Sequence, residues 1–192
     1  MDAYSMRNQL LLMLICLSSV AFGQSEESHK AEHFKPRHSL GIIIGHDHVL
    51  NGRDEHGNKK TLILPYWGLD YNFQFAPKFS IGLHTDFIME SFKVEKHLES
   101  GSQEVVERTW PIAPAIMGFY KPTEHWSFGF GMGAEFSKEE DFVLNRLAIE
   151  YGTEIKNGWE VFGVVQYDFR WDAYDNWTIE LGIAKVFGHK KE

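Results

Sequence analysis

The sequence predicts an all-β protein, an eight-stranded antiparallel up-and-down transmembrane β-barrel. Three observations support this prediction. The chain opens with an export signal, it continues with eight short segments in which apolar and polar residues alternate, and short turns between these segments alternate with longer polar loops. An exported chain with two-residue periodicity and this asymmetry of its connections is typical of a barrel that crosses an outer membrane with strands.

Residues 1–23 have the three parts of a cleaved signal peptide. Arg7 supplies the positive charge, Leu10 to Val20 is apolar, and Ala21 and Gly23 are small residues at the positions that a signal peptidase inspects. The apolar run is shorter than the roughly 20 residues that a membrane-spanning helix needs. We therefore expect export and cleavage rather than a helical anchor.

Composition narrows the possible functions further. The formal net charge of −8 argues against nucleic-acid binding. Cys16 is the only cysteine and lies within the predicted signal, so the mature chain would have no disulfide and no cysteine ligand. Aromatic residues make up 15% of the chain, which is a high share, and many fall near the ends of the alternating segments, as in the interfacial belts of membrane proteins.

The clearest alternating segment runs from Trp126 to Phe136. One face would carry Trp126, Phe128, Phe130, Met132, Ala134 and Phe136. The other face is mostly glycine, which suits a crowded barrel interior where little volume is free. The remaining predicted strands are Leu40–Leu50, Ile63–Phe75, Phe79–Met89, Val105–Tyr120, Val143–Thr153, Val161–Trp171 and Trp177–Phe187.

The fourth of these segments is the least regular. Pro111 and Pro114 lack the backbone N–H that a ladder needs, so a bulge or a local break is expected there. The short connections Ala76–Lys78, Lys121–His125 and Lys156–Gly158 would be periplasmic turns, and Asn51–Lys60 would be a long external loop. With eight strands, both termini are then periplasmic.

The last segment carries a polar residue, a glycine and a final aromatic, at Glu180, Gly182 and Phe187. With the alternation, this pattern resembles the small outer-membrane β-barrel family, the OmpA/OmpX-like eight-stranded type, over residues 38–187. The resemblance implies residence in the outer membrane of a Gram-negative-type envelope, contact with outer-membrane lipid, and recognition by the outer-membrane assembly machinery. Residues 24–37 would be a polar leader, and residues 188–192 a polar tail.

The predicted inner face is rich in charge. Its acidic residues are Asp70, Asp86, Glu90, Glu135, Glu150, Glu154, Glu160, Asp168 and Glu180, and its arginines are Arg146 and Arg170. Because buried charges need partners, we expect a lumen ion-pair network of Arg146, Arg170, Glu150, Asp168 and Asp86. The excess of acids leaves a second interpretation open, a cation site or a narrow cation-permeable pore.

Signals for a metal or for catalysis are weak. The His46-Asp47-His48 run, with His56 in the next loop, could hold a divalent metal, because His46 and His48 would share a face and imidazole is a good metal ligand. No third ligand is demonstrated beside these two, so no metal or other cofactor is predicted. His125-Trp126-Ser127 superficially resembles the histidine–x–serine element of lipid A deacylases. Acyl transfer would also need an orienting carboxylate and an oxyanion site, and the element falls at a predicted periplasmic turn, so no enzyme is predicted.

The sequence thus predicts an integral outer-membrane protein with a structural, adhesive or surface-loop binding role and no catalysis. The loop partner is left open. The alternatives are the narrow cation pore, a lipid-modifying barrel enzyme, and a soluble exported lipocalin-like carrier. A carrier would place its aromatic residues inside the barrel and its charges outside.

Overall fold

A computed structural model describes residues 34–54, 56–97, 103–171 and 173–188 of the chain. The predicted signal peptide, most of the polar leader and nearly all of the polar tail lie outside these ranges. The described strands are β1 (Arg37–Arg53), β2 (Lys59–Ala76), β3 (Phe79–Ile88), β4 (Ser91–His97), β5 (Gln103–Thr109), β6 (Ile112–Tyr120), β7 (Trp126–Glu135), β8 (Phe142–Glu154), β9 (Trp159–Arg170) and β10 (Asp175–Phe187). A short 3-10 turn, η1 (Lys156–Gly158), joins β8 to β9. No helix in the described part of the chain is long and apolar enough to cross a membrane.

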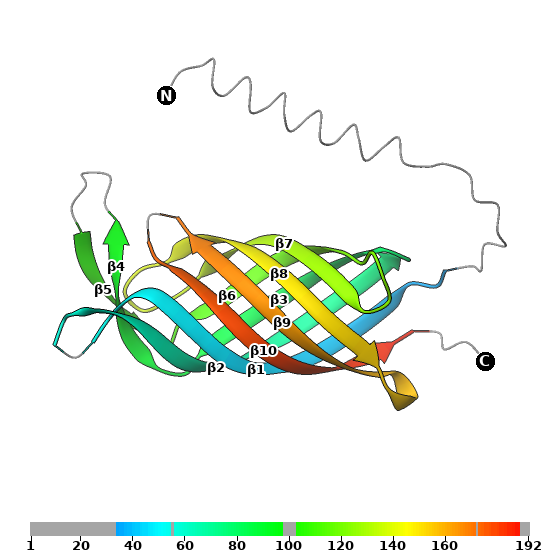
Figure 1. Cartoon of the computed structure of the whole chain (residues 1–192). Coiled ribbons are helices and arrows are strands. Elements are labelled where there is room, and N and C mark those ends of the chain that lie inside the picture. The colour runs from blue at the N-terminus through cyan, green and yellow to red at the C-terminus, as the bar shows by residue number, and fades with distance from the viewer. Residues whose placement is uncertain (1–33, 55, 98–102, 172, 189–192) are drawn as a thin grey trace, which may run out of the picture. The chain divides into compact units, whose positions relative to one another are not determined.

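Eight of these strands close into a barrel, which confirms the predicted fold class (Figure 1). The wall runs in the order β1, β2, β3, β6, β7, β8, β9, β10, and β10 pairs antiparallel with β1 from His38↔Phe187 to Val49↔Asn176. Such closure leaves no unpaired edge in the wall. The short connections β2–β3, β6–β7 and β8–β9, together with the start of β1 and the end of β10, lie at one end of the barrel, here called the turn end.

The two faces of the wall have opposite chemistry. Large apolar residues point outward and stay exposed, among them Phe128, Phe130, Leu181 and Ile183. The inward residues include the buried Asp168 and other charged groups. This arrangement is the reverse of a lipocalin-like carrier, so that alternative is wrong. The exposed apolar surface surrounds the barrel, which is what contact with lipid requires.

Glycines on the inner face make room for bulky side chains of the neighbouring strand. A Cβ on Gly131 would lie 2.2 Å from Met117 Sδ, and a Cβ on Gly129 would lie 2.5 Å from a ring carbon of Phe119. Met117 and Phe119 belong to an apolar layer in the lumen, whose members are Ile43, Ala113, Ala115, Met117, Phe119, Leu144, Ala148, Phe162, Val164 and Ala184. The inner face is therefore less polar than predicted, because this apolar layer fills part of the lumen.

The predicted break in the fourth strand is confirmed. The chain leaves β5 at Thr109 and enters β6 at Ile112, and Trp110 between them has φ of 50°. Pro114 remains within β6. Pairing of β6 with β7 begins only at Ala115↔Gly133, so this proline lies where the ladder to β7 is interrupted and its missing N–H removes no ladder bond there.

The predicted long loop at Asn51–Lys60 is wrong in its length. Strand β1 continues into it as far as Arg53 and β2 begins at Lys59, so only a short connection remains between the two strands. The Asp54 carboxylate accepts hydrogen bonds from the backbone N–H of His56 at 2.9 Å and of Asn58 at 2.8 Å. These bonds lower the pKa of Asp54, with Asn58 as the main cause, and they let an aspartate-headed turn join two long strands.

A hairpin of β4 and β5 is inserted between β3 and β6 at the end opposite the short turns (Figure 1). It pairs with β1 beyond the end of the β1–β10 ladder, at Gly52↔Val94 and Arg53↔Lys93. Beneath it lies a second apolar cluster, formed by Val49, Leu64, Tyr66, Ile88, Phe92, Val94, Phe142, Ala173 and Tyr174. Because these residues come from several sides of the wall, they close this end of the lumen. We call the hairpin and this cluster the cap.

Candidate functional site

The centre of the polar interior is Glu135, the last residue of β7. Its carboxylate accepts hydrogen bonds from Arg108 Nε at 2.8 Å, from Arg170 Nε at 2.5 Å and from the Tyr174 hydroxyl at 2.8 Å. All four residues are fully or almost fully buried. Arg108 also donates from Nη1 to the Glu140 carbonyl at 2.5 Å. One carboxylate thus joins β5 of the cap to β9 and to the β9–β10 connection.

A second cluster lies next to the first and centres on Arg146 of β8. Its guanidinium donates two parallel hydrogen bonds to Asp168, both at 2.8 Å, and its Nη2 lies 2.6 Å from Asp86 Oδ2. Gln166 Nε2 donates to the same Asp86 oxygen at 2.9 Å. Paired bonds between arginine and a carboxylate fix the geometry of both groups, so this layer is rigid.

The two clusters are continuous. Arg170 Nη2 lies 3.8 Å from Asp168 Oδ2, and Arg170 also donates to Asn176, whose amide donates to Asp47 at 2.5 Å. Space among these side chains is scarce, since the cavity that they line measures about 10 Å³. That is room for about one water molecule.

Four of the five residues predicted for the ion-pair network lie together in this region: Arg146, Asp168, Asp86 and Arg170. Glu150 does not join them. It lies nearer the turn end, opposite Ser127 in the β7–β8 register, and forms no ion pair with any described residue. The partner of Arg170 also differs from expectation, because its shorter contact is with Glu135 and not with Asp168.

Two inward assignments are wrong. Arg108 was not expected inside, yet its side chain is fully buried, because β5 departs from the wall and folds over the lumen. No alternation signal could reveal this, since the position of an inserted hairpin is set by tertiary packing. Glu90 was expected inside but is exposed, because it lies at the bend between β3 and β4.

The weak metal candidate residues do not converge. Asp47 points into the lumen and binds Asn176, whereas His46 is exposed on the outer face. His48 stacks on Trp177 with ring centroids 3.9 Å apart, and His56 lies in the turn between β1 and β2. Across the described ranges, no group of three or more histidine, cysteine or acidic side chains is arranged to hold a metal ion.

The histidine–x–serine element lies at the turn end. His125 is exposed, and its Nδ1 lies 3.0 Å from the carbonyl oxygen of Gly152, where a catalytic histidine would need a carboxylate. Ser127 is buried and points inward, opposite Glu150. The arrangement lacks the chain of nucleophile, base and orienting acid that acyl transfer requires.

Comparison with known proteins identifies the fold. No protein-family model and no curated protein matches the chain. Ail, the attachment invasion locus protein of Yersinia pestis, is similar in structure, with a TM-score of 0.51 and 12% identity over 80% of this chain and 100% of that one. Neisserial surface protein A gives a TM-score of 0.47 with 6% identity over 78% and 97% of the two chains. The outer membrane protein OprG of Pseudomonas aeruginosa gives 0.47 with 13% identity over 81% and 97%. The fold is that of a small outer-membrane β-barrel, as the sequence resemblance implied.

Proposed function

We propose that the chain is an integral outer-membrane barrel with a closed lumen, whose cap is a surface for binding an external partner. The observation that carries this proposal is the cap itself. Its hairpin lies beyond the β1–β10 ladder and packs on an apolar cluster of its own. Lipid would surround the apolar wall, with exposed tryptophans at both ends: Trp126 and Trp159 at the turn end, and Trp171 near the cap.

Ion pairs and hydrogen bonds connect the cap to the neighbouring strands and loops. The buried Glu95 of β4 pairs with Arg53 and, at 3.4 Å, with Lys59. On the other side, the Thr109 hydroxyl donates to Glu139 at 2.7 Å, and this bond is the main cause that lowers the pKa of Glu139. A surface ordered in advance loses less conformational entropy when it binds, which favours a recognition role.

The outward side of the hairpin offers a mixed surface. Its exposed side chains include Lys93, Val105, Glu107 and the neighbouring Trp110. Aromatic residues among charges are frequent in protein recognition surfaces. These residues do not belong to the buried network, so they can be replaced without disturbing the closure of the lumen.

Whole-cell adherence tests the proposed binding role. Cells that display the protein are compared on a panel of immobilised glycans and matrix proteins with cells that display the variant Lys93→Ala/Glu107→Ala/Trp110→Ala. We expect adherence to at least one surface and its loss by about tenfold or more in the variant, the scale of a single recognition hot spot. Equal adherence of both strains, or none above that of cells lacking the protein, would contradict the binding role.

A narrow cation pore is the second candidate, because buried acids outnumber buried arginines. The acids are Asp47, Asp70, Asp86, Glu95, Glu135, Asp168 and Glu180, and the arginines are Arg108, Arg146 and Arg170.

The proposed function has no catalytic step. It requires the wall to enter the membrane through the assembly machinery, with β10 ending at Phe187 as the last strand.

Conductance separates the closed barrel from the pore. In planar bilayers we expect no sustained single-channel current from the purified protein, because Met117, Phe119 and the Arg146 layer fill the lumen. Brief currents of small size should favour cations. Steady channels of porin size, or a preference for anions, would show that the lumen is open and that its charges are misassigned.

A further inference from the structure

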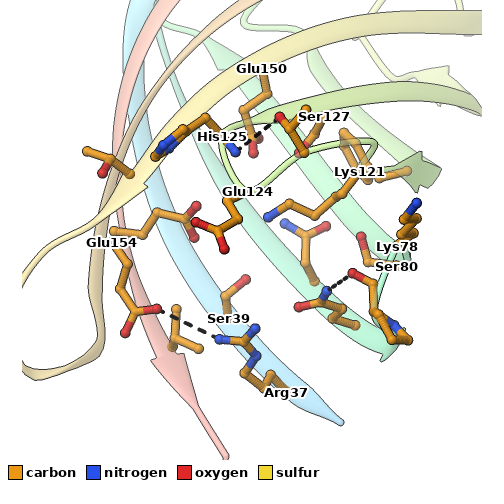
Figure 2. A pocket seen from close by; sticks show the side chains of 18 of the residues that line it. Arg37, Ser39, Lys78, Ser80, Lys121, Glu124, His125, Ser127, Glu150 and Glu154 are labelled. Carbon is orange, nitrogen blue, oxygen red and sulfur yellow. Dashed lines mark hydrogen bonds and ion pairs between the residues drawn. The ribbon is translucent and has the colours of Figure 1, made fainter. Parts of the chain in front are cut away.

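The turn end of the barrel holds a cavity of about 620 Å³ (Figure 2). This size falls within the range of about 300–1,000 Å³ that is common for small-molecule sites. The cavity reaches inward to Phe119, Ser127 and Glu150, and its mouth is formed by the turns between β2 and β3 and between β6 and β7, with the ends of β1, β8 and β9. It lies at the end opposite the cap, so it is independent of the binding role proposed above.

The two lysines of the cavity and most of its acids lie on different elements of the barrel. Lys78 and Lys121 come from the two turns, which are tied together by a hydrogen bond of 2.8 Å from the Lys121 N–H to the Lys78 carbonyl. Most of the acids come from the other side, where Glu150 and Glu154 lie on β8 and Glu160 lies on β9, while Glu124 lines the cavity from the turn that also carries Lys121. Figure 2 shows the lysines on one side of the cavity and Glu154 on the other.

The carboxylates of Glu150, Glu154 and Glu160 lie on neighbouring strands, and few positive charges lie near them. Glu154 and Glu160 are directly opposite each other in the β8–β9 register, where like charges repel. Gly152 lies inward between Glu150 and Glu154, and Glu160 Oε1 would be 2.9 Å from a Cβ at that glycine. The glycine thus lets the Glu160 carboxylate lie over the cavity wall. Arg37 contacts Glu154 alone, at 3.7 Å.

The lysines and the carboxylates of the cavity make no direct ionic contact with each other. Within the described part of the chain, Lys78, Lys121, Glu150 and Glu160 form no ion pair, although all four line the same cavity. A molecule with an ammonium group at one end and a carboxylate at the other would satisfy both groups at once.

The rest of the lining indicates the ligand class. Ser39, Asn72, Gln74, Ser80 and Thr123 supply neutral hydrogen-bonding groups, and apolar side chains are few. Such a wall suits peptide groups and does not suit a lipid chain. We propose that this cavity binds short zwitterionic peptides, with the peptide ammonium at Glu150 and Glu160 and the peptide carboxylate at Lys78 and Lys121.

Calorimetric titration of the full-length processed protein in nanodiscs tests this proposal with trialanine as the probe. N-acetyl-trialanine and trialanine amide each lack one charge, so each should bind about tenfold more weakly or worse than the free peptide. Glu160→Gln should reduce the difference between the free and the acetylated peptide, because only Glu150 of the proposed pair then remains to bind the ammonium. Lys121→Met should reduce the difference between the free peptide and the amide, because only Lys78 then remains to bind the carboxylate.

Glu107→Gln, on the cap, is the matched control and should leave all affinities unchanged. Folding of each variant is checked by heat-modifiable migration on gels. The proposal is overturned by the absence of binding at ~10 mM trialanine, which corresponds to less than about 3 kcal/mol of affinity, or by capped and free peptides that bind equally. Loss of binding in the control alone would place the ligand at the cap. Because adherence depends on the cap, either proposal can fail without the other.

Discussion

Glu135→Ala should strongly destabilise the barrel, by on the order of 3–5 kcal/mol. The reason is that one buried carboxylate satisfies two buried arginines. Without it, Arg108 and Arg170 keep their charges in a space that excludes water, and the Tyr174 hydroxyl loses the acceptor that it has at 2.8 Å. The cap is held to the wall through the same contacts, so it should loosen as well.

Urea unfolding from lipid vesicles, followed by tryptophan fluorescence, measures the expected loss. Glu135→Ala combined with Arg108→Met removes one unpaired charge and should recover part of the stability, while Glu107→Ala on the exposed side of the same hairpin should change it by less than about 0.5 kcal/mol. If Glu135→Ala and Glu107→Ala unfold at the same urea concentration, the buried cluster does not support the cap.

The wall of the barrel could be predicted from the sequence because lipid imposes one simple rule on it. Every second residue must be apolar on the outside, so the face of Trp126, Phe128 and Phe130 determines both the strand and its register. The same rule places Arg146 and Asp168 inward, and adjacent strands then bring them into direct register. Local periodicity is therefore sufficient for this part of the network.

The cap could not be predicted in the same way. Its hairpin follows a bend at Glu90 and ends at a residue with positive φ, Trp110, and neither feature has a periodic signal. Its inward side chains, such as Arg108, meet partners more than 25 positions away in the chain, since Arg108 and Glu135 are 27 residues apart. Contacts of this kind depend on how the wall closes, which alternation alone does not specify.

The side chains that fill the lumen could not be predicted from alternation alone either. An inward position was expected to be polar or glycine, but a narrow barrel also needs volume to be filled. Phe162 fills the space over Gly182, where a Cβ would lie 2.3 Å from its ring. Glu150 was grouped with the arginines because it is inward and acidic. Its distance along the barrel axis places it instead beside the cavity at the turn end.

Arg146→Met should reduce the free energy of unfolding by a similar amount, on the order of 3–5 kcal/mol. The substitution leaves Asp168 with Arg170 at 3.8 Å as its remaining cation, and it leaves Asp86 with the Gln166 amide at 2.9 Å. Two buried carboxylates would then lie close together without the guanidinium that separates their charges. Methionine fills a similar length of the lumen, so the loss reports charge rather than a cavity.

The double variant Arg146→Met/Asp168→Asn decides whether the pair itself is responsible. Removing the orphaned charge should restore a large part of the lost stability, because a neutral amide is far less costly to bury than an unpaired carboxylate. The interaction energy from the cycle of wild type, two single variants and the double variant should exceed about 1 kcal/mol. Glu160→Gln at the turn end, in contact with water, is the matched control and should show little effect. Additive losses would mean that the bidentate contact at 2.8 Å contributes no coupling and that the lumen is stabilised by apolar packing alone.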